Sequence, residues 1–369
     1  LWGPRDARPE PDGTRLRDSQ CGLFATGKVL RRFQVPFTYM TNCRLTDPEF
    51  ERGVWDFLAV CNVVKTFKHT RILQMATRPF DFWSTMCNEG ELLEKFNIQL
   101  SPIPMTELVQ AVRDAQADEQ AMAAMLAHIS DSFEICIPED KVPAVAGLAI
   151  AMKRLVEKYG CNAGAIQCWN ALQDELGIMP CAANAILNEM GIPIVCETDI
   201  HGAITALMVE AADLGRHRGM FADWTVRHPD NENGELLQHC GPWPCSCAAV
   251  KPKLTYPLAF DHPGALTAEA KHGDLTLARF DGDNGEYSLL LGNARGIDGP
   301  AGMGTCLWVE GDNLKRLEAK IVEGPYIHHC VAIHANVVPV LYEACKYIGI
   351  VPDLYDPIEE DVKAYLRGE

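Results

Sequence analysis

The chain has 369 residues, 47% of them hydrophobic, which is enough for two domains with cores of their own. Its formal net charge of −17 argues against a nucleic-acid partner, because phosphate backbones attract clustered lysine and arginine. No apolar run is long enough to cross a membrane, and the N-terminus carries no signal-peptide pattern. The 15 cysteines lack the spacing of a disulfide framework, so we expect reduced thiols and a cytoplasmic protein.

The first part of the chain alternates short apolar strands with amphipathic helices. This order predicts a parallel sheet covered on both faces, in a Rossmann-like or flavodoxin-like domain over residues 1–160. No G-x-G-x-x-G fingerprint follows a strand, so a dinucleotide site is not expected. The expected strands are 33–41, 71–77, 99–105 and 163–170, and the expected helices are 48–69, 89–98, 106–130 and 144–160.

The second part, residues 161–369, is predicted to be a C-terminal α/β domain with an inserted β-rich region. A helix at 180–191, a strand at 192–196 and a helix at 202–215 continue the alternation. From 216 to 310, short β-like segments are separated by Gly, Asp, Asn and Pro turns, which predicts an antiparallel, barrel-like sheet. A strand at 328–334 and a helix at 337–349 follow.

Two carboxylates, Glu197 and Asp199, end the expected strand 192–196. Open parallel sheets bind ligands beyond the carboxyl ends of their strands, and residues i and i+2 of a strand point to the same side. Both side chains are therefore expected to face one pocket, where carboxylate oxygens suit Mg²⁺ or Mn²⁺ or general acid–base catalysis. In the alternative interpretation, one carboxylate caps the next helix and the other is solvated.

Two further groups contain candidate ligands. Glu175, in "NALQDELG", belongs to a helical pattern in which a carboxylate is usually a surface charge. In "GPYIHHCVAIH", one of the adjacent residues His328 and His329 points into a site if the segment is extended, as a metal ligand or as a buried core histidine.

The segment "LQHCGPWPCSC" offers His239 together with Cys240, Cys245 and Cys247. No second pair completes a C-x₂-C set, so a loop packed around Trp243 is expected in preference to a structural zinc site.

Taken together, these clusters resemble the L-fucose isomerase / L-arabinose isomerase family. The resemblance rests on "IQCWNALQDELGIMPCAANAILNEMGIPIVCETDIHGAI", "LQHCG" and "PYIHHCVAIH", and it extends over essentially the whole chain. It implies an intramolecular oxidoreductase that interconverts an aldose and a ketose through a cis-enediol. It also implies a divalent cation, usually Mn²⁺ but alternatively Mg²⁺ or Co²⁺, held by two acids and a histidine.

By this resemblance, Glu175, Asp199 and His329 are the metal ligands, and the two acids are also the catalytic residues. Glu197 replaces Asp199 if the arabinose-type pattern holds. The positions of His328, His239 and Gln167 match residues near the substrate.

The resemblance also implies a small fucose-like, arabinose-like or modified sugar as substrate, and a homo-oligomer, either a trimer or a hexamer. The chain begins without methionine, and we expect the family's N-terminal domain to be absent from it. An alternative function is a non-catalytic sugar-binding protein on the same scaffold.

Overall fold

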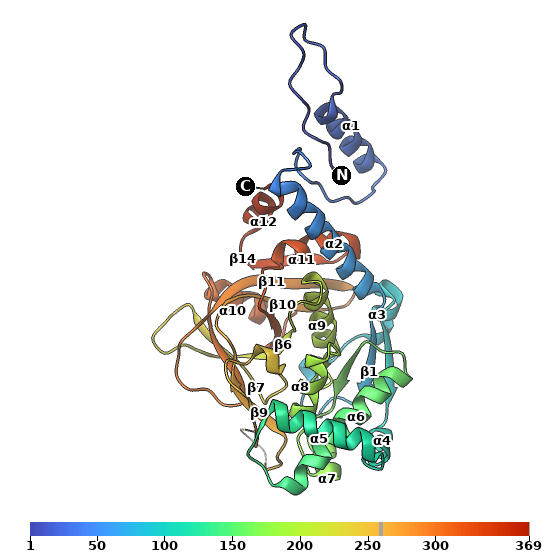
Figure 1. Ribbon diagram of the computed structural model, residues 1–369, viewed down its shortest axis with the longest axis vertical. Helices are drawn as coiled ribbons and strands as arrows, with labels where there is room; N and C mark the ends of the chain where they lie inside the picture. Colours follow the sequence, from blue (N-terminus) through green and yellow to red (C-terminus); the bar gives the residue numbers. More distant parts are fainter. Residues whose placement is uncertain (258–260, 369) are drawn as a thin grey trace.

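The computed structural model describes residues 1–257 and 261–368, and it contains two sheets (Figure 1). The smaller sheet is parallel, with the strand order β2-β1-β4-β5. Its strands are β1 (Arg71–Met75), β2 (Gln99–Ile103), β4 (Ala163–Ile166) and β5 (Ile194–Val195). The predicted α/β class is therefore confirmed. The Rossmann-like detail and the domain boundaries remain predictions.

Helices cover both faces of the parallel sheet because its side chains alternate. Leu73 and Met75 pack into one core with α4 (Met105–Gln116), α5 (Glu119–Ser132), α6 (Val142–Lys158) and α8 (Cys181–Glu189). Ile72 faces the opposite core, which includes side chains from α2 (Pro48–Lys68), α3 (Glu89–Phe96) and α9 (Ile200–Ala212).

The larger sheet contains a closed six-stranded barrel. Going round the barrel, each strand is antiparallel to the next, and the pairing between β11 and β12 closes the ring. The predicted antiparallel region is thus confirmed, with one strand added from beyond residue 310. In ring order the strands are β11 (Glu286–Ile297), β10 (Asp274–Asp283), β13 (His329–Ile333), β6 (Met220–Arg227), β7 (Gly234–His239) and β12 (Thr305–Glu310).

Four short strands extend the barrel sheet at its two ends. These are β14 (Val351–Asp356) beside β11, and β9 (Ala265–Glu269), β8 (Lys253–Thr255) and β3 (Glu134–Ile135) beyond β12. One of the β-like segments expected between 216 and 310 is "LTYPLAF", residues 254–260. Its start coincides with β8, and residues 258–260 lie outside the described part of the chain.

Helix α9 joins the two sheets. All of its residues are buried, as expected for a helix that is apolar on every side. It contacts β4 and β5 of the parallel sheet and β10 and β13 of the barrel. Its N-terminus therefore places the residues that follow β5 between the two sheets.

Two of the expected elements differ in the structure. The segment 33–41 forms no strand: Gln34 has a φ of 57°, and Pro36 has no N–H to donate to a neighbouring strand. The helix expected at 106–130 is split into α4 and α5, because the side chain of Asp118 caps the second helix by accepting from the N–H of Ala121.

The remaining helices are α1 (Ser19–Arg32), α7 (Ala171–Leu176), α10 (Leu314–Glu323), α11 (Val338–Ile348) and α12 (Glu359–Arg367). Helix α11 agrees with the expected helix at 337–349. Helix α1 belongs to an N-terminal arm that extends away from α2 (Figure 1). Within residues 1–257 and 261–368, no helix is both long and apolar enough to span a bilayer.

Candidate functional site

The turn between β5 and α9 has a strained backbone. Glu197 and Thr198 both have positive φ angles, 52° and 54°. Non-glycine residues adopt such angles at an energetic cost, and they cluster at functional sites. Because the chain is not extended here, the alternation that put Glu197 and Asp199 on one side does not apply.

The two carboxylates instead approach opposite edges of the His329 ring. Oδ2 of Asp199 lies 2.8 Å from Nδ1 of His329, and Oε2 of Glu197 lies 3.6 Å from Nε2. His329 is the first residue of β13, and its side chain is buried. The structure thus brings His329 to two acids that lie about 130 residues earlier in the chain, and it gives those two acids different contacts.

Both oxygens of Asp199 are fully used by hydrogen bonds. Oδ1 accepts from the N–H of Gly202 at 3.0 Å and from Nη2 of Arg279 at 3.1 Å. Oδ2 accepts from Nη1 of Arg279 and pairs with His329. The helix-capping interpretation is therefore correct for Asp199. These four contacts hold Asp199 against Arg279, His329 and the start of α9. Its role as a metal ligand remains a prediction from resemblance.

Arg279 lies at the centre of β10 and connects two buried acids. It is only 1% exposed, and its Nε donates to Oδ2 of Asp281 at 2.9 Å. Asp281 also pairs with Nδ1 of His201 at 2.8 Å. Burial alone would raise the pKa of Asp199, but Arg279 and then His329 hold that pKa well below its usual range. The strand sequence "LTLARFDG" contained the signal, a charged residue in the middle of an apolar run.

Four side chains, Glu197, Asp223, His239 and His329, form what we call the His–carboxylate cluster. The ligand atoms of Glu197, His239 and His329 all lie within 4.8 Å of one another. Oδ1 of Asp223, on β6, lies 3.4 Å from Nε2 of His329 and 3.9 Å from Nε2 of His239.

Two carboxylate oxygens in this cluster are buried without a hydrogen-bond partner. They are Oε2 of Glu197 and Oδ1 of Asp223, and both are close to Nε2 of His329. Buried polar atoms nearly always have partners, so two unpaired oxygens beside an imidazole nitrogen fit a divalent cation as the missing partner. The other oxygen of Glu197 accepts from the thiol of Cys168, at 3.4 Å.

Glu197 is ionised in this setting. Burial would raise its pKa, but the imidazoles of His239 and His329 and the hydrogen bond from Cys168 lower that pKa to about 2. A buried carboxylate that keeps its negative charge is suited to binding a cation.

The two histidines of the cluster present opposite tautomers. An ionised Asp199 can only accept, so Nδ1 of His329 carries the proton and Nε2 directs its lone pair at the cluster. In His239, Nδ1 accepts the N–H of Cys240 at 2.9 Å, which leaves the proton on Nε2. Burial lowers the pKa of His239, but the charges of Asp223 and Glu197 outweigh burial and raise that pKa well above its usual value, which keeps a proton on Nε2. The geometry therefore favours His329 as a ligand and His239 as a hydrogen-bond donor.

This difference leads to a prediction for the metal-free protein. Long-range ¹H–¹⁵N NMR spectra are expected to show His329 protonated at Nδ1 and His239 protonated at Nε2. With Asn in place of Asp199, the proton of His329 is no longer held on Nδ1, so both of its tautomers are expected. The tautomer of His239 is expected to stay unchanged. If both rings showed the same tautomer, the division between ligand and donor would be wrong.

The remaining residues expected at the site lie in different places. The ligand atom of His328 lies within 4.8 Å of those of Asp223 and His329, and the side chain is exposed. Glu175 is exposed on α7 and belongs to none of the potential metal-binding groups among the described residues. Its role as a ligand remains a prediction from resemblance. In the part of the chain that the structure describes, Cys240, Cys245 and Cys247 form no such group either.

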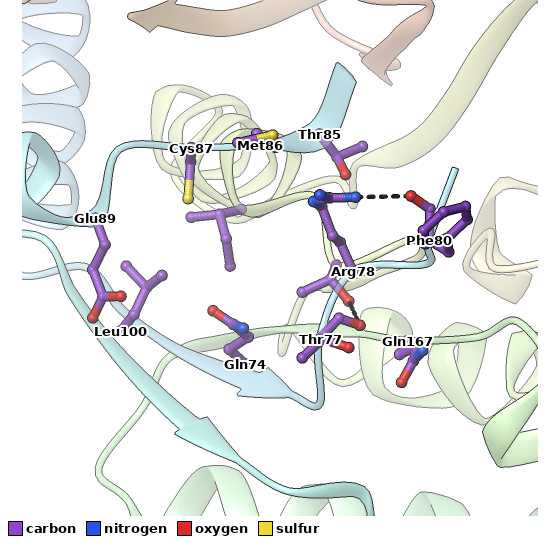
Figure 2. Close-up of a pocket in the computed structure, with 12 residues that line it drawn as sticks. Gln74, Thr77, Arg78, Phe80, Thr85, Met86, Cys87, Glu89, Leu100 and Gln167 are labelled. Carbon is purple, nitrogen blue, oxygen red and sulfur yellow. Dashed lines mark hydrogen bonds between the residues drawn. The ribbon is translucent and has the colours of Figure 1, made fainter. Parts of the chain in front are cut away.

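Next to the turn lies a cavity of about 610 Å³, a volume typical of small-molecule sites (Figure 2). Thr198 and Ile200, which flank Asp199, line it together with Gln167, which was expected near the substrate. The hydroxyl of Thr198 donates to the carbonyl of Thr77 at 3.2 Å, which ties the turn to the end of β1.

Comparison with known proteins gives consistent matches. A family model described as the fucose/sulfoquinovose isomerase N-terminal domain matches residues 1–68. A sulfoquinovose isomerase from Priestia aryabhattai is 22% identical, over 96% of this chain and 79% of the relative. Sulfoquinovose isomerases from Alkalicoccus urumqiensis and a Clostridium species are 23% and 24% identical, over 95% and 96% of this chain and 79% and 80% of the relatives. The matched residues 1–68 lie in the part of the chain where no counterpart of that N-terminal domain was expected.

Proposed function

Because the chain belongs to the fucose isomerase-like family, we propose that it is a metal-dependent isomerase that interconverts an aldose and a ketose of a small sugar. One observation carries the metal dependence: the unpaired, buried oxygens of Glu197 and Asp223 lie beside the free lone pair of His329. A non-catalytic sugar-binding protein would not need this combination.

We assign Glu197, Asp223 and His329 as the cation ligands. This assignment prefers the rival acid Glu197 to Asp199, whose oxygens are already occupied. Two carboxylates and one imidazole, with further positions open, suit six-coordinate Mn²⁺ better than tetrahedral zinc. The cation would supply a Lewis acid that polarises the carbonyl group of the open-chain sugar.

The chain's own residues would then move the proton. Isomerisation through a cis-enediol requires a base that takes a proton from one carbon and returns it to the neighbouring carbon. The side chain of Asp223 is 32% exposed and that of Glu197 only 7%, so Asp223 is the carboxylate that a bound sugar can reach. The Nε2–H of His239 is placed to donate to the sugar oxygen on which negative charge develops.

Sulfoquinovose, a sugar that carries a sulfonate group, is the first substrate to test, because the matched relatives are named for it. Fucose and arabinose follow from the resemblance. The trimeric or hexameric assembly and the cytoplasmic location also remain proposals.

The test is to incubate the protein with a panel of aldoses and to measure their turnover by NMR of the anomeric signals. Chelator-treated protein is expected to be inactive, and added Mn²⁺ is expected to restore isomerisation of at least one sugar. Binding of a sugar without turnover in Mn²⁺, Mg²⁺ or Co²⁺ would favour the non-catalytic alternative. Equal activity with and without chelator would contradict the metal dependence.

A further inference from the structure

The cavity beside the turn contains an arginine without an acidic partner. Arg78 follows β1 and lines the cavity. Within residues 1–257 and 261–368, no carboxylate oxygen lies within 4.0 Å of its guanidinium, whereas Arg279 and Arg218 both have acidic partners. Glu89 lines the same cavity, but it forms no ion pair with Arg78.

The guanidinium of Arg78 is nevertheless held in place. Its Nη1 donates to the carbonyl oxygens of Pro79 and Phe80, at 3.3 and 3.1 Å, and the second of these bonds is drawn in Figure 2. The guanidinium also lies over the ring of Trp83, 4.9 Å from its centre. These contacts orient the side chain through one nitrogen and leave other N–H donors available for a ligand.

The surroundings of Arg78 fit the polar end of a ligand. Thr77, Thr85 and Gln74 line the same cavity and add hydroxyl and amide groups. The cavity borders the turn between β5 and α9, because Thr198 lines it and the hydroxyl of Thr85 donates to the carbonyl of Glu197 at 3.4 Å. The four residues of the His–carboxylate cluster do not line this cavity. A sugar with C1 and C2 at the cluster must therefore extend past the turn to bring its other end to Arg78.

We propose that Arg78 is a specificity-determining residue that binds an anionic group at the end of the sugar remote from C1 and C2. This inference rests on the proposed function. A guanidinium forms paired, charge-assisted hydrogen bonds with sulfonate, phosphate and carboxylate oxygens, so these groups share the required chemistry. A neutral sugar leaves the guanidinium without that partner and binds more weakly.

The experiment compares four hexoses of one configuration that differ at C6. Sulfoquinovose, glucose 6-phosphate and glucuronate carry a sulfonate, a phosphate and a carboxylate, and quinovose carries a hydrogen. In the 369-residue chain with Mn²⁺, at least one anionic sugar is expected to exceed quinovose in kcat/KM. Arg78→Gln is expected to lower kcat/KM for that sugar about tenfold to a hundredfold and to leave quinovose unchanged.

Two further variants serve as controls. Arg78→Lys keeps the positive charge without the two-pronged geometry and is expected to give an intermediate loss. Arg154→Gln removes an arginine on α6 that is exposed and outside the cavity. It is expected to change kcat/KM neither for the anionic sugar nor for quinovose.

Calorimetric binding of the matching sugar alcohols, which cannot isomerise, separates the two proposals. Tighter binding of the anionic alcohol, lost in Arg78→Gln, supports the inference even if no sugar is turned over. Turnover of quinovose with no anionic preference overturns the inference and leaves the isomerase proposal standing. Equal binding of both alcohols, or binding of neither, also overturns the inference.

Discussion

Replacing Glu197 by Gln is expected to lower Mn²⁺ affinity and kcat/KM by about a thousandfold each. The amide has nearly the same shape but is neutral, so the buried cation would lose a charged ligand. Changing a residue that only supports a ligand typically costs tenfold to a hundredfold, and a direct ligand should cost more. The affinity is measured by calorimetry on the metal-free protein, and kcat/KM with the best sugar of the panel.

Glu175→Gln is the matched control for this substitution. Glu175 is exposed and lies outside the His–carboxylate cluster, so the change is expected to leave both quantities within about twofold. If Glu175→Gln abolished Mn²⁺ binding while Glu197→Gln retained it, the assignment from family resemblance would be right and the assignment from geometry wrong.

Replacing Arg279 by Met is expected to destabilise the protein by about 3–5 kcal/mol. Met fills a similar volume, but it leaves the carboxylates of Asp199 and Asp281 buried without the guanidinium that pairs with both of them. Removing one member of a buried charge network is far more costly than removing an exposed ion pair. The measurement is the shift of the urea unfolding curve of the metal-free protein, monitored by fluorescence and circular dichroism.

Two variants check that this loss comes from the buried charges. Arg154→Met breaks an exposed ion pair with Asp118 and is expected to leave the unfolding curve almost unchanged, because solvent screens the pair. Arg279→Lys keeps the charge but cannot make two bonds to each acid, so its loss is expected to fall between the other two. A loss below about 1 kcal/mol for Arg279→Met would show that the network contributes little.

Local patterns in the sequence were sufficient to find the strand that carries the site. The apolar run before Glu197 and the helical pattern after Asp199 located the end of β5 and the start of α9. The different roles of the two acids could not be predicted, because they depend on Arg279, which is 80 residues away from Asp199 in the chain. They also depend on the positive φ angles of Glu197 and Thr198. Glu and Thr rarely adopt such angles, so the sequence does not predict them.

The difference between local patterns and contacts of distant residues also explains which elements were predicted correctly. Helix α2 begins at a proline that follows an aspartate, and its apolar spacing is visible within the segment. The segment 33–41 has the apolar character of a strand, but a strand also needs a neighbour with which to pair. Asp223 was missed for a related reason, since a single acid within "MFADWTVR" is unremarkable until β13 pairs beside it.

The order of strands in the barrel has a consequence for how the protein is made. β13 is the last barrel strand in the sequence, and it occupies the gap between β10 and β6. During synthesis, the other five strands leave the ribosome while that gap is still open. Because β13 begins with His329, the step that closes the barrel also delivers the imidazole to Glu197 and Asp223. Tight cation binding should therefore report a finished barrel, and a nascent chain that stops short of residue 329 should lack it.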